Sequence, residues 1–233
     1  MALAHSPKIA TDGMVLCLDA GNTKSYPGSG TTWSDLSGNG NNGSLVNMDG
    51  ANFNSANGGS LTFDGSNEYV DCGNKQDFII SNGQSFTISC WALYDSSLNV
   101  FNGILSKAAV NGTWEYVFGI NSVAVVSWLI SSNGTNWNPI FGETISFGTW
   151  YYYSFGFDYD NQISFLSVNG KPFLTRSHTS VYNTSGESLQ IGRIRDPIVN
   201  MDGKISNLSF YNRALSASEV KQNFNALRGR FGL

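Results

Sequence analysis

The sequence is short of charge. Only 13% of its 233 residues are Asp, Glu, Lys or Arg, which is about half the usual share in a globular protein. The basic residues form no group denser than Arg193, Arg195, Arg228 and Arg230, so no face is concentrated enough to neutralise a nucleic-acid backbone. No segment approaches the ~20 apolar residues that span a bilayer, and we expect no membrane insertion. The first residues lack a basic region followed by an apolar core, so no secretory signal is expected.

Cysteine and histidine are also scarce. Cys17, Cys72 and Cys90 are odd in number and lack C-x-x-C spacing, which favours reduced, buried thiols over a disulfide framework. A single disulfide among them is the alternative. His5 and His178 stand in polar surroundings, and we interpret both as surface residues. They match neither a zinc-ligand spacing nor a nucleophile–base arrangement.

Closely spaced acids are missing as well. Hydrolysis of a glycan needs two carboxyl groups that face one glycosidic bond. The sequence has five Glu, and none stands in a short acidic run on a predicted strand. Asp158 and Asp160 are two residues apart, but Asp160 opens a predicted turn. We therefore expect that the protein is not an enzyme.

Aromatic residues and glycine are abundant instead. The chain has 15 Phe, 10 Tyr, 6 Trp and 26 Gly, the composition of many strands joined by turns. The clearest alternation is Tyr151, Tyr153, Phe155, Phe157 and Tyr159 on one face. Asn169-Gly170 lies between two apolar runs and predicts a hairpin, so 151–176 should form a three-stranded meander. Further strands are predicted at 14–18, 60–63, 69–72, 85–94, 103–106, 114–120, 124–130, 188–194 and 203–211.

One helix is predicted near the C-terminus, at 216–228. It begins with a capping box, Ser216-Ala217-Ser218-Glu219, in which the two polar side chains satisfy free backbone amides. Val220, Phe224 and Leu227 then share one face, and Gly229 is placed to end the helix. We expect this helix to close an edge or an end of the sandwich.

Seven stretches of the sequence carry a family resemblance. They are Leu16–Asn22, Tyr26–Trp33, Asp35–Gly43, Leu61–Val70, Phe86–Trp91, Gly203–Ser216 and Gln222–Gly232. Together they resemble the laminin-G-like jelly rolls of the concanavalin A-like lectin/glucanase superfamily, and the last stretch is similar to versions found in bacteriophage virion proteins. The resemblance implies an all-β sandwich of two antiparallel sheets, with the short C-terminal helix. We assign residues 13–233 to this domain and residues 1–12 to an N-terminal arm that could attach the protein to a partner.

Loop aromatics next to asparagine are the candidates for sugar binding. Trp137 follows Asn133 and Asn136 in a loop with no apolar neighbours to bury it, and an exposed indole can stack on a pyranose ring. Trp33 and Trp114 lie near other loops of this kind. For each aromatic, local packing is the alternative.

One loop has the pattern of a cation site. Asp35, Ser37 and Asn39 present oxygen ligands at alternate positions before Gly40, as in the first half of a calcium loop. Position twelve is Val46, where a calcium loop of the EF-hand type needs Glu, so calcium is a candidate ligand and no cofactor is required. The alternative is a turn whose side chains bond their own backbone.

These observations lead to one expected function and two rivals. The resemblance implies a virion surface protein, either decorating the head or part of a tail fibre, that is made in the host cytoplasm and adheres to host glycans. Its expected partners are other virion proteins, further copies of itself and the glycan. A purely structural virion module that binds only its neighbours is the first rival. A glycan hydrolase is the second.

Overall fold

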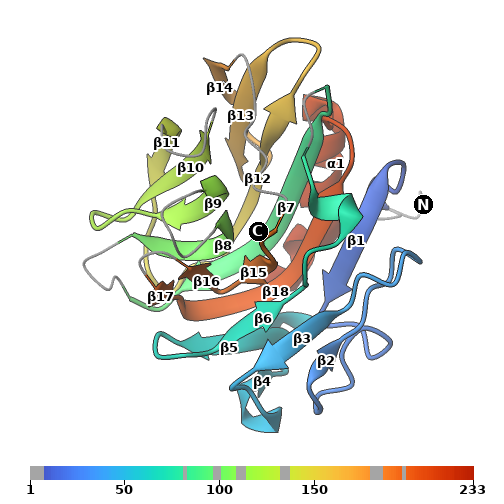
Figure 1. The fold of residues 1–233 in the computed structure, drawn as a ribbon. Helices are drawn as coiled ribbons and strands as arrows, with labels where there is room; N and C mark the ends of the chain where they lie inside the picture. Colours follow the sequence, from blue (N-terminus) through green and yellow to red (C-terminus); the bar gives the residue numbers. More distant parts are fainter. Residues whose placement is uncertain are drawn as a thin grey trace, which may run out of the picture.

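Two antiparallel sheets packed face to face make up the fold (Figure 1). The computed structural model describes residues 8–80, 83–96, 101–108, 114–131, 137–178, 186–195 and 198–233. Sheet A has the order β14-β13-β12-β7-β18-β5-β4, with β1 also on β18, and sheet B has the order β11-β10-β9-β8-β15-β6-β3-β2. This is the all-β jelly-roll sandwich that the sequence predicts. No helix in these ranges is long and apolar enough to cross a membrane.

The strands are bounded as follows. Sheet A contains β1 (Met14–Asp19), β4 (Phe53–Asn54), β5 (Ser60–Asp64), β7 (Phe86–Tyr94), β12 (Tyr151–Asp158), β13 (Ile163–Val168), β14 (Leu174–Ser177) and β18 (Asp202–Tyr211). Sheet B contains β2 (Thr32–Trp33), β3 (Gly43–Val46), β6 (Tyr69–Asp71), β8 (Asn102–Ala108), β9 (Trp114–Ile120), β10 (Val125–Ser131), β11 (Trp137–Thr144) and β15 (Leu189–Ile191). A small hairpin pairs β16 (Arg193–Arg195) with β17 (Ile198–Asn200).

The meander at 151–176 is confirmed. β12 pairs with β13 and β13 pairs with β14, all antiparallel. Asn169 and Gly170 both have positive φ, 53° and 66°, which is the backbone that a two-residue hairpin turn requires. The alternation ends one residue earlier than predicted, because β12 stops at Asp158 and Tyr159 is exposed.

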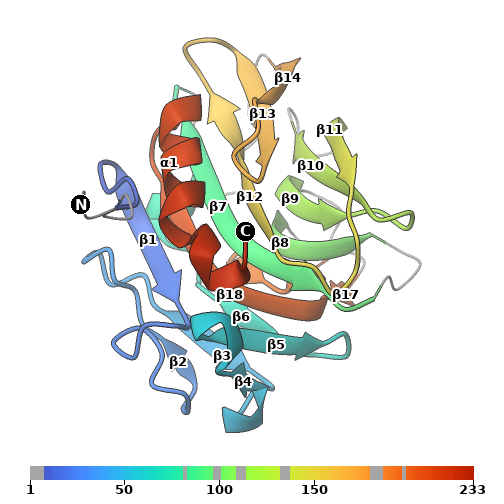
Figure 2. The same cartoon turned by 180° about the vertical axis from the view of Figure 1, so that it is seen from behind.

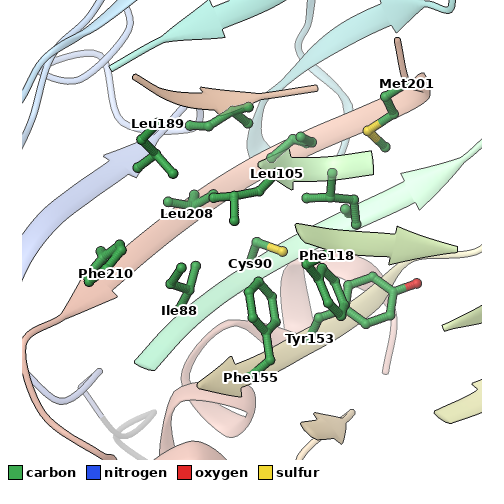
Figure 3. Close-up of a cluster of buried hydrophobic side chains, with 14 of the residues drawn as sticks. Ile88, Cys90, Leu105, Phe118, Tyr153, Phe155, Leu189, Met201, Leu208 and Phe210 are labelled. Carbon is green, nitrogen blue, oxygen red and sulfur yellow. The ribbon is translucent and has the colours of Figure 1, made fainter. Parts of the chain in front are cut away.

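The main core lies between the sheets. Buried side chains from sheet A meet buried side chains from sheet B there (Figure 3). The rings of Phe118 on β9 and Phe155 on β12 stack across the gap with centroids 3.8 Å apart. Burial of aromatic side chains supplies most of the hydrophobic stabilisation in such a sandwich. The buried residues labelled in Figure 3 are Ile88, Cys90, Leu105, Phe118, Tyr153, Phe155, Leu189, Met201, Leu208 and Phe210.

The outer face of sheet A is covered by the C-terminal helix. α1 (Ala217–Leu227) lies across β7 and β18 in Figure 2, and a 3₁₀ turn at Arg228–Phe231 follows it. The predicted capping box is present between Ser216 and Glu219. The α-helix ends directly before Gly229, as predicted, with Arg228 as its C-cap. Gly229 itself is part of the 3₁₀ turn, and the left-handed residue is Gly232, at φ 74°.

Several strands also differ from the prediction, and the short strands β2, β3, β4 and β17 were not predicted. The predicted strand 188–194 is two strands, because Gly192 has φ 78° and turns the chain out of sheet B into the β16–β17 hairpin. β11 was not predicted, since Pro139 and Gly142 interrupt its pattern. β11 is an edge strand, and a proline is tolerated there because one side of the strand needs no partner.

A buried ion pair interrupts the apolar interior. Lys107 on β8 and Glu115 on β9 have no exposed side-chain surface, and Lys107 Nζ lies 2.7 Å from Glu115 Oε1. The pairing of the two strands shifts register between Lys107 and Ala108, so Glu115 is the extra residue of a β-bulge. Burying these charges is tolerable only because each neutralises the other.

Candidate functional site

The strand topology brings two of the predicted aromatic positions to one end of sheet B. β9 begins at Trp114 and β11 begins at Trp137, and the two strands run in the same direction on either side of β10. Trp114 is partly buried. Asn133 and Asn136, as well as the side chain of Trp137, lie outside the described residues. We call the end of the sandwich where β9 and β11 begin the β9–β11 rim.

Trp33 is not part of this rim. Its side chain is 0% exposed and belongs to the main core. It lies on β2, at the opposite edge of sheet B from β11. An indole without exposed surface cannot stack on a sugar, so the prediction of Trp33 as a sugar contact is wrong. The alternative, local packing, holds for this residue.

The end of the β12–β14 meander completes the rim. Asn138 on β11 donates from Nδ2 to Nδ1 of His178, 2.9 Å away. His178 directly follows β14, so this hydrogen bond connects sheet B to sheet A. The interpretation of His178 as a surface residue is wrong, since it is 2% exposed and packs edge-on against Phe157. Burial, with help from the charge of Arg176, lowers the pKa of His178. His5 lies outside the described residues.

Tyr159 is an exposed aromatic residue at this end. It stands in the turn between β12 and β13, is 38% exposed, and its backbone N–H is held by the Ser85 hydroxyl. In the same turn, Asn161 donates to the Asp158 carboxylate from both its side chain and its backbone N–H. The sequence assigned Tyr159 to the buried face of a strand. The polar Asp160-Asn161 turn beside it was the signal that the strand had already ended.

The candidate cation loop is bonded to its own chain. Asp35 Oδ1 accepts hydrogen bonds from the backbone N–H groups of Cys17 and Ser37, while Oδ2 accepts from the Asn41 N–H and the Ser37 hydroxyl. Asn39 donates to carbonyl oxygens of β1 and to Ser37. Each Asp35 oxygen therefore has two donors, and a cation would have to displace them. This is the self-bonded turn that the sequence offered as the alternative to a metal loop.

Glu68 and Asp64 also form hydrogen bonds within the chain. Burial raises the pKa of Glu68, whose carboxylate accepts from Asn52 Nδ2 and from the Asp64 N–H and so clamps the β5–β6 turn. The Ser66 backbone N–H lowers the pKa of Asp64. The three cysteines are free, and burial raises the pKa of Cys17 to about 11. Across the described ranges, no group of three His, Cys, Asp or Glu side chains is arranged to hold a metal ion.

A family model decides what kind of domain this is. The model of the concanavalin A-like lectin/glucanases superfamily matches residues 64–221. The chain belongs to this superfamily. Its laminin-G-like signature had pointed to the same family from the sequence. None of the curated protein sequences matches the chain.

Solved structures share this superfamily fold. The binding domain of botulinum neurotoxin DC, in complex with rat synaptotagmin II, is 16% identical with a TM-score of 0.68 over 93% of this chain and 52% of its own. A structure of botulinum neurotoxin type C is 15% identical, with a TM-score of 0.67 over 93% of this chain and 52% of its own. Its description states that cell entry of this toxin is dependent upon interaction with two ganglioside molecules. A Trypanosoma rangeli sialidase mutant is 16% identical, with a TM-score of 0.68 over 97% and 34%. The chain spans about half the length of the neurotoxin domains, and at these identities the likeness shows the fold alone.

Proposed function

We propose that the protein is a non-catalytic surface component of a phage particle, of the head-decorating or tail-fibre type, that adheres to host glycans through the β9–β11 rim. The observation that carries the proposal is the rim itself. On a lectin-type sandwich, the topology gathers an exposed tyrosine, a partly buried tryptophan and amide and carboxylate groups at one end.

The chemistry of the rim suits a sugar. A pyranose ring has an apolar face that stacks on an aromatic ring and a rim of hydroxyl groups that bind amides and carboxylates. Tyr159 supplies the exposed ring, and Asn138, Asp158 and Asn161 supply polar groups beside it. Trp114 and Trp137 stand at the ends of strands that open onto the same region. Cell entry of botulinum neurotoxin type C, a structure of which has the same fold, depends on interaction with two ganglioside molecules, and this supports a glycan as the ligand.

The non-catalytic part of the proposal rests on how the acids are used. The Asp158 carboxylate holds a turn, and Glu68 accepts hydrogen bonds that fix another turn. A glycosidase needs two carboxyl groups that are free to face one bond. Acids committed to backbone hydrogen bonds are poorly placed for that work.

The virion part rests on the sequence. The closing stretch Gln222–Gly232 is similar to phage versions of the fold, and the low-charge, Asn-rich and Gly-rich composition suits contacts with other proteins. We propose that the protein is made in the host cytoplasm, is carried on the particle surface and docks on virion proteins and on copies of itself. Mass spectrometry of purified particles, with antibody labelling in electron micrographs, tests this. Absence from the particle overturns it.

A glycan array followed by titration of the best ligand tests the adhesion. We expect Tyr159→Ala, Trp114→Ala and Trp137→Ala each to weaken binding by about ten-fold, because loss of a stacked ring costs roughly 1–2 kcal/mol. Phe147→Ala is the matched control. Phe147 is an aromatic residue of similar exposure, 42%, in the turn after β11 at the opposite end of the sandwich. No binding at millimolar concentration, or equal losses in all four variants, contradicts the proposal.

A second candidate, a purely structural module, is favoured by a different surface. An open hollow of about 500 Å³ lies between the edge strand β11 and the end strands β13 and β14. Phe141 and Leu174 line it and are 59% and 47% exposed. Exposed apolar side chains that gather in this way mark protein contacts. If Phe141→Ser and Leu174→Ser abolish incorporation into particles while no glycan binds, the structural role is the correct one.

A further inference from the structure

The edge where the two sheets meet at β11 and β14 is only partly closed. β11 is an end strand of sheet B and β14 an end strand of sheet A, and β11 lies beside both β13 and β14 (Figures 1 and 2). On the side of the β9–β11 rim, Arg176 donates from Nη1 to the Pro139 carbonyl at 2.7 Å. At the other end, Lys171 forms an ion pair with Glu143 at 2.5 Å. The open hollow of about 500 Å³ lies between these two polar contacts.

The hollow has an apolar floor and two protruding apolar walls. Leu166 and Val168 on β13 line it and are buried. Phe141 and Leu174 line it from the two end strands and are 59% and 47% exposed, which places them among the most exposed large apolar side chains of the described ranges. The seam between the sheets is therefore closed by polar contacts at both ends and open to solvent over an apolar stretch.

This shape suits a protruding side chain of another protein. A small-molecule site usually encloses about 70–90% of its ligand, whereas this hollow is open and its walls stand out into solvent. Exposed apolar side chains that gather in one place mark protein contacts. A side chain that could fill the hollow stands on the same surface, because Phe141 presents its ring beside it.

The charges beside the hollow favour a second copy of this chain as the partner. The chain has a formal net charge of -4, so two copies repel each other on average. Beside the hollow, however, one base and one acid stand together, and the side chains of Lys171 and Glu143 remain 59% and 36% exposed. In a two-fold contact the same surface occurs on both copies. Lys171 of each copy would then face Glu143 of the other, and Phe141 of each copy would enter the opposite hollow.

The backbone of β11 is poorly suited to extending the sheet into a second copy. Pro139 has no N–H to donate, and its carbonyl already accepts from Arg176. The pairing of β11 with β10 also shifts register between Val125 and Ser127, and such a bulge bends an edge strand. Both features protect an edge from strand addition. A second copy would therefore be held by side chains.

We propose that two copies of this chain associate through Phe141, Glu143, Lys171 and Leu174, which we call the edge patch, with each Phe141 ring in the hollow of the other copy. The β9–β11 rim lies at the start of β11, whereas Phe141 and Glu143 stand in its second half, so the contact leaves the rim uncovered. A dimer then carries two rims. The self-association is independent of glycan adhesion, and only the gain from two rims rests on the proposed function.

Sedimentation velocity of the full chain, without any glycan, tests the contact. We expect a dimer with a Kd of roughly ten micromolar, as for a small interface. Phe141→Ser and Leu174→Ser should each weaken it about ten-fold, because each removes an apolar anchor, while the thermal midpoint stays unchanged. Leu36→Ser is the matched control, since Leu36 is 37% exposed in the loop after β2, at the opposite edge of sheet B. A chain that stays monomeric at about 300 µM, or equal weakening by Leu36→Ser, overturns the proposal.

Exchange of the two charges tests the two-fold geometry. Glu143→Lys leaves two bases on the edge patch and Lys171→Glu leaves two acids, so each variant alone should self-associate about ten-fold more weakly than the parent. Their thermal midpoints should stay close to that of the parent, because an exposed ion pair contributes little to stability. When the two variants are mixed, every contact between unlike copies is attractive. Fluorescence-detected sedimentation should then show a mixed dimer as tight as the parent. If mixing restores nothing, the edge patch does not meet its own copy and the proposal fails.

The glycan affinity of Phe141→Ser separates self-association from adhesion. For a monovalent sugar, its Kd should equal that of the parent, because Phe141 is not at the rim. On a glycan-coated surface, its apparent affinity should fall at least about ten-fold, because a monomer binds through one rim only. Equal binding of parent and variant to that surface contradicts the gain from two rims. A dimeric parent that binds no glycan supports the self-association and overturns the adhesion.

Discussion

The two faces of sheet A are covered in different ways, and adjacent residues on β12 show the contrast. Tyr153 faces the main core, where an entire second sheet closes the interior. Tyr152 faces the opposite side, where one 11-residue helix, a 3₁₀ turn and an N-terminal segment are the cover. Sheet B covers most of the inner face of sheet A, while the short helix covers only a stripe of the outer face. The packing between the two sheets, the inner layer, is therefore continuous. The packing between sheet A and α1, the outer layer, leaves a cavity.

The largest effect should come from breaking the ion pair in the inner layer. Lys107→Met leaves the Glu115 carboxylate in a site without exposed surface, and we expect a loss of about 3–5 kcal/mol in the free energy of unfolding. Urea denaturation measures it. The double variant Lys107→Met with Glu115→Leu removes both charges and should recover most of the loss. A loss below about 1 kcal/mol for the single variant would mean that water reaches this site, and that the inner layer is less closed than described.

Truncating one aromatic in each layer compares their packing directly. Phe155 is 0% exposed and stacks on Phe118, so Phe155→Ala should cost about 3–5 kcal/mol. Phe224 on α1 is partly buried against Trp91 and Tyr152, so Phe224→Ala should cost about half as much. Both values come from the same denaturation experiment. Equal losses would contradict the view that the outer layer is the more weakly packed.

The meander of sheet A could be predicted from the sequence because the patterns that specify it are local. Alternation along 151–158 and the Asn169-Gly170 turn both act between neighbours in the chain, and they gave the correct meander. The capping box at Ser216 gave the correct start of α1 for the same reason. β11 was missed because Pro139 and Gly142 are disfavoured in strands, and only its position at the edge of sheet B makes them acceptable.

The sites were harder to predict because exposure is set by distant segments. Trp33 sits in a loop-like Gly-rich and Ser-rich stretch, yet β3 and β6 carry it into the main core. His178 stands in a polar sequence, but its partner Asn138 is 40 residues away. The cavity beneath α1 joins residues from both ends of the chain, and no local pattern marks such a meeting. Trp114 and Trp137 come to one rim through the order β9-β10-β11, which could not be predicted because β11 was missed.

A smaller effect is expected at the start of α1. The Ser216 hydroxyl accepts a hydrogen bond from the Glu219 N–H, and Ser216→Ala leaves this amide without its cap. The free energy of unfolding should fall by about 1 kcal/mol. Hydrogen exchange should show the loosening in 217–227 and not in β9 or β10. Loosening that extends equally to sheet B would mean that the two layers unfold as one unit.

Lowering the pH should destabilise the packing of α1 on sheet A through the carboxylate of Glu219. Hydrogen bonds from Arg213, and then from Ser216, hold the pKa of Glu219 at about 2, against an ordinary value of 4.5. Because the folded pKa is the lower one, the unfolded chain takes up the proton first. The contribution of Glu219 is therefore complete above pH 4.5 and is lost as the pH falls towards about 2. Glu219→Gln removes this ionisation, so the difference in thermal midpoint between variant and parent should shrink across that window. If the Glu219→Gln profile runs parallel to that of the parent, the Arg213–Glu219 pair does not couple the anchoring of α1 to pH.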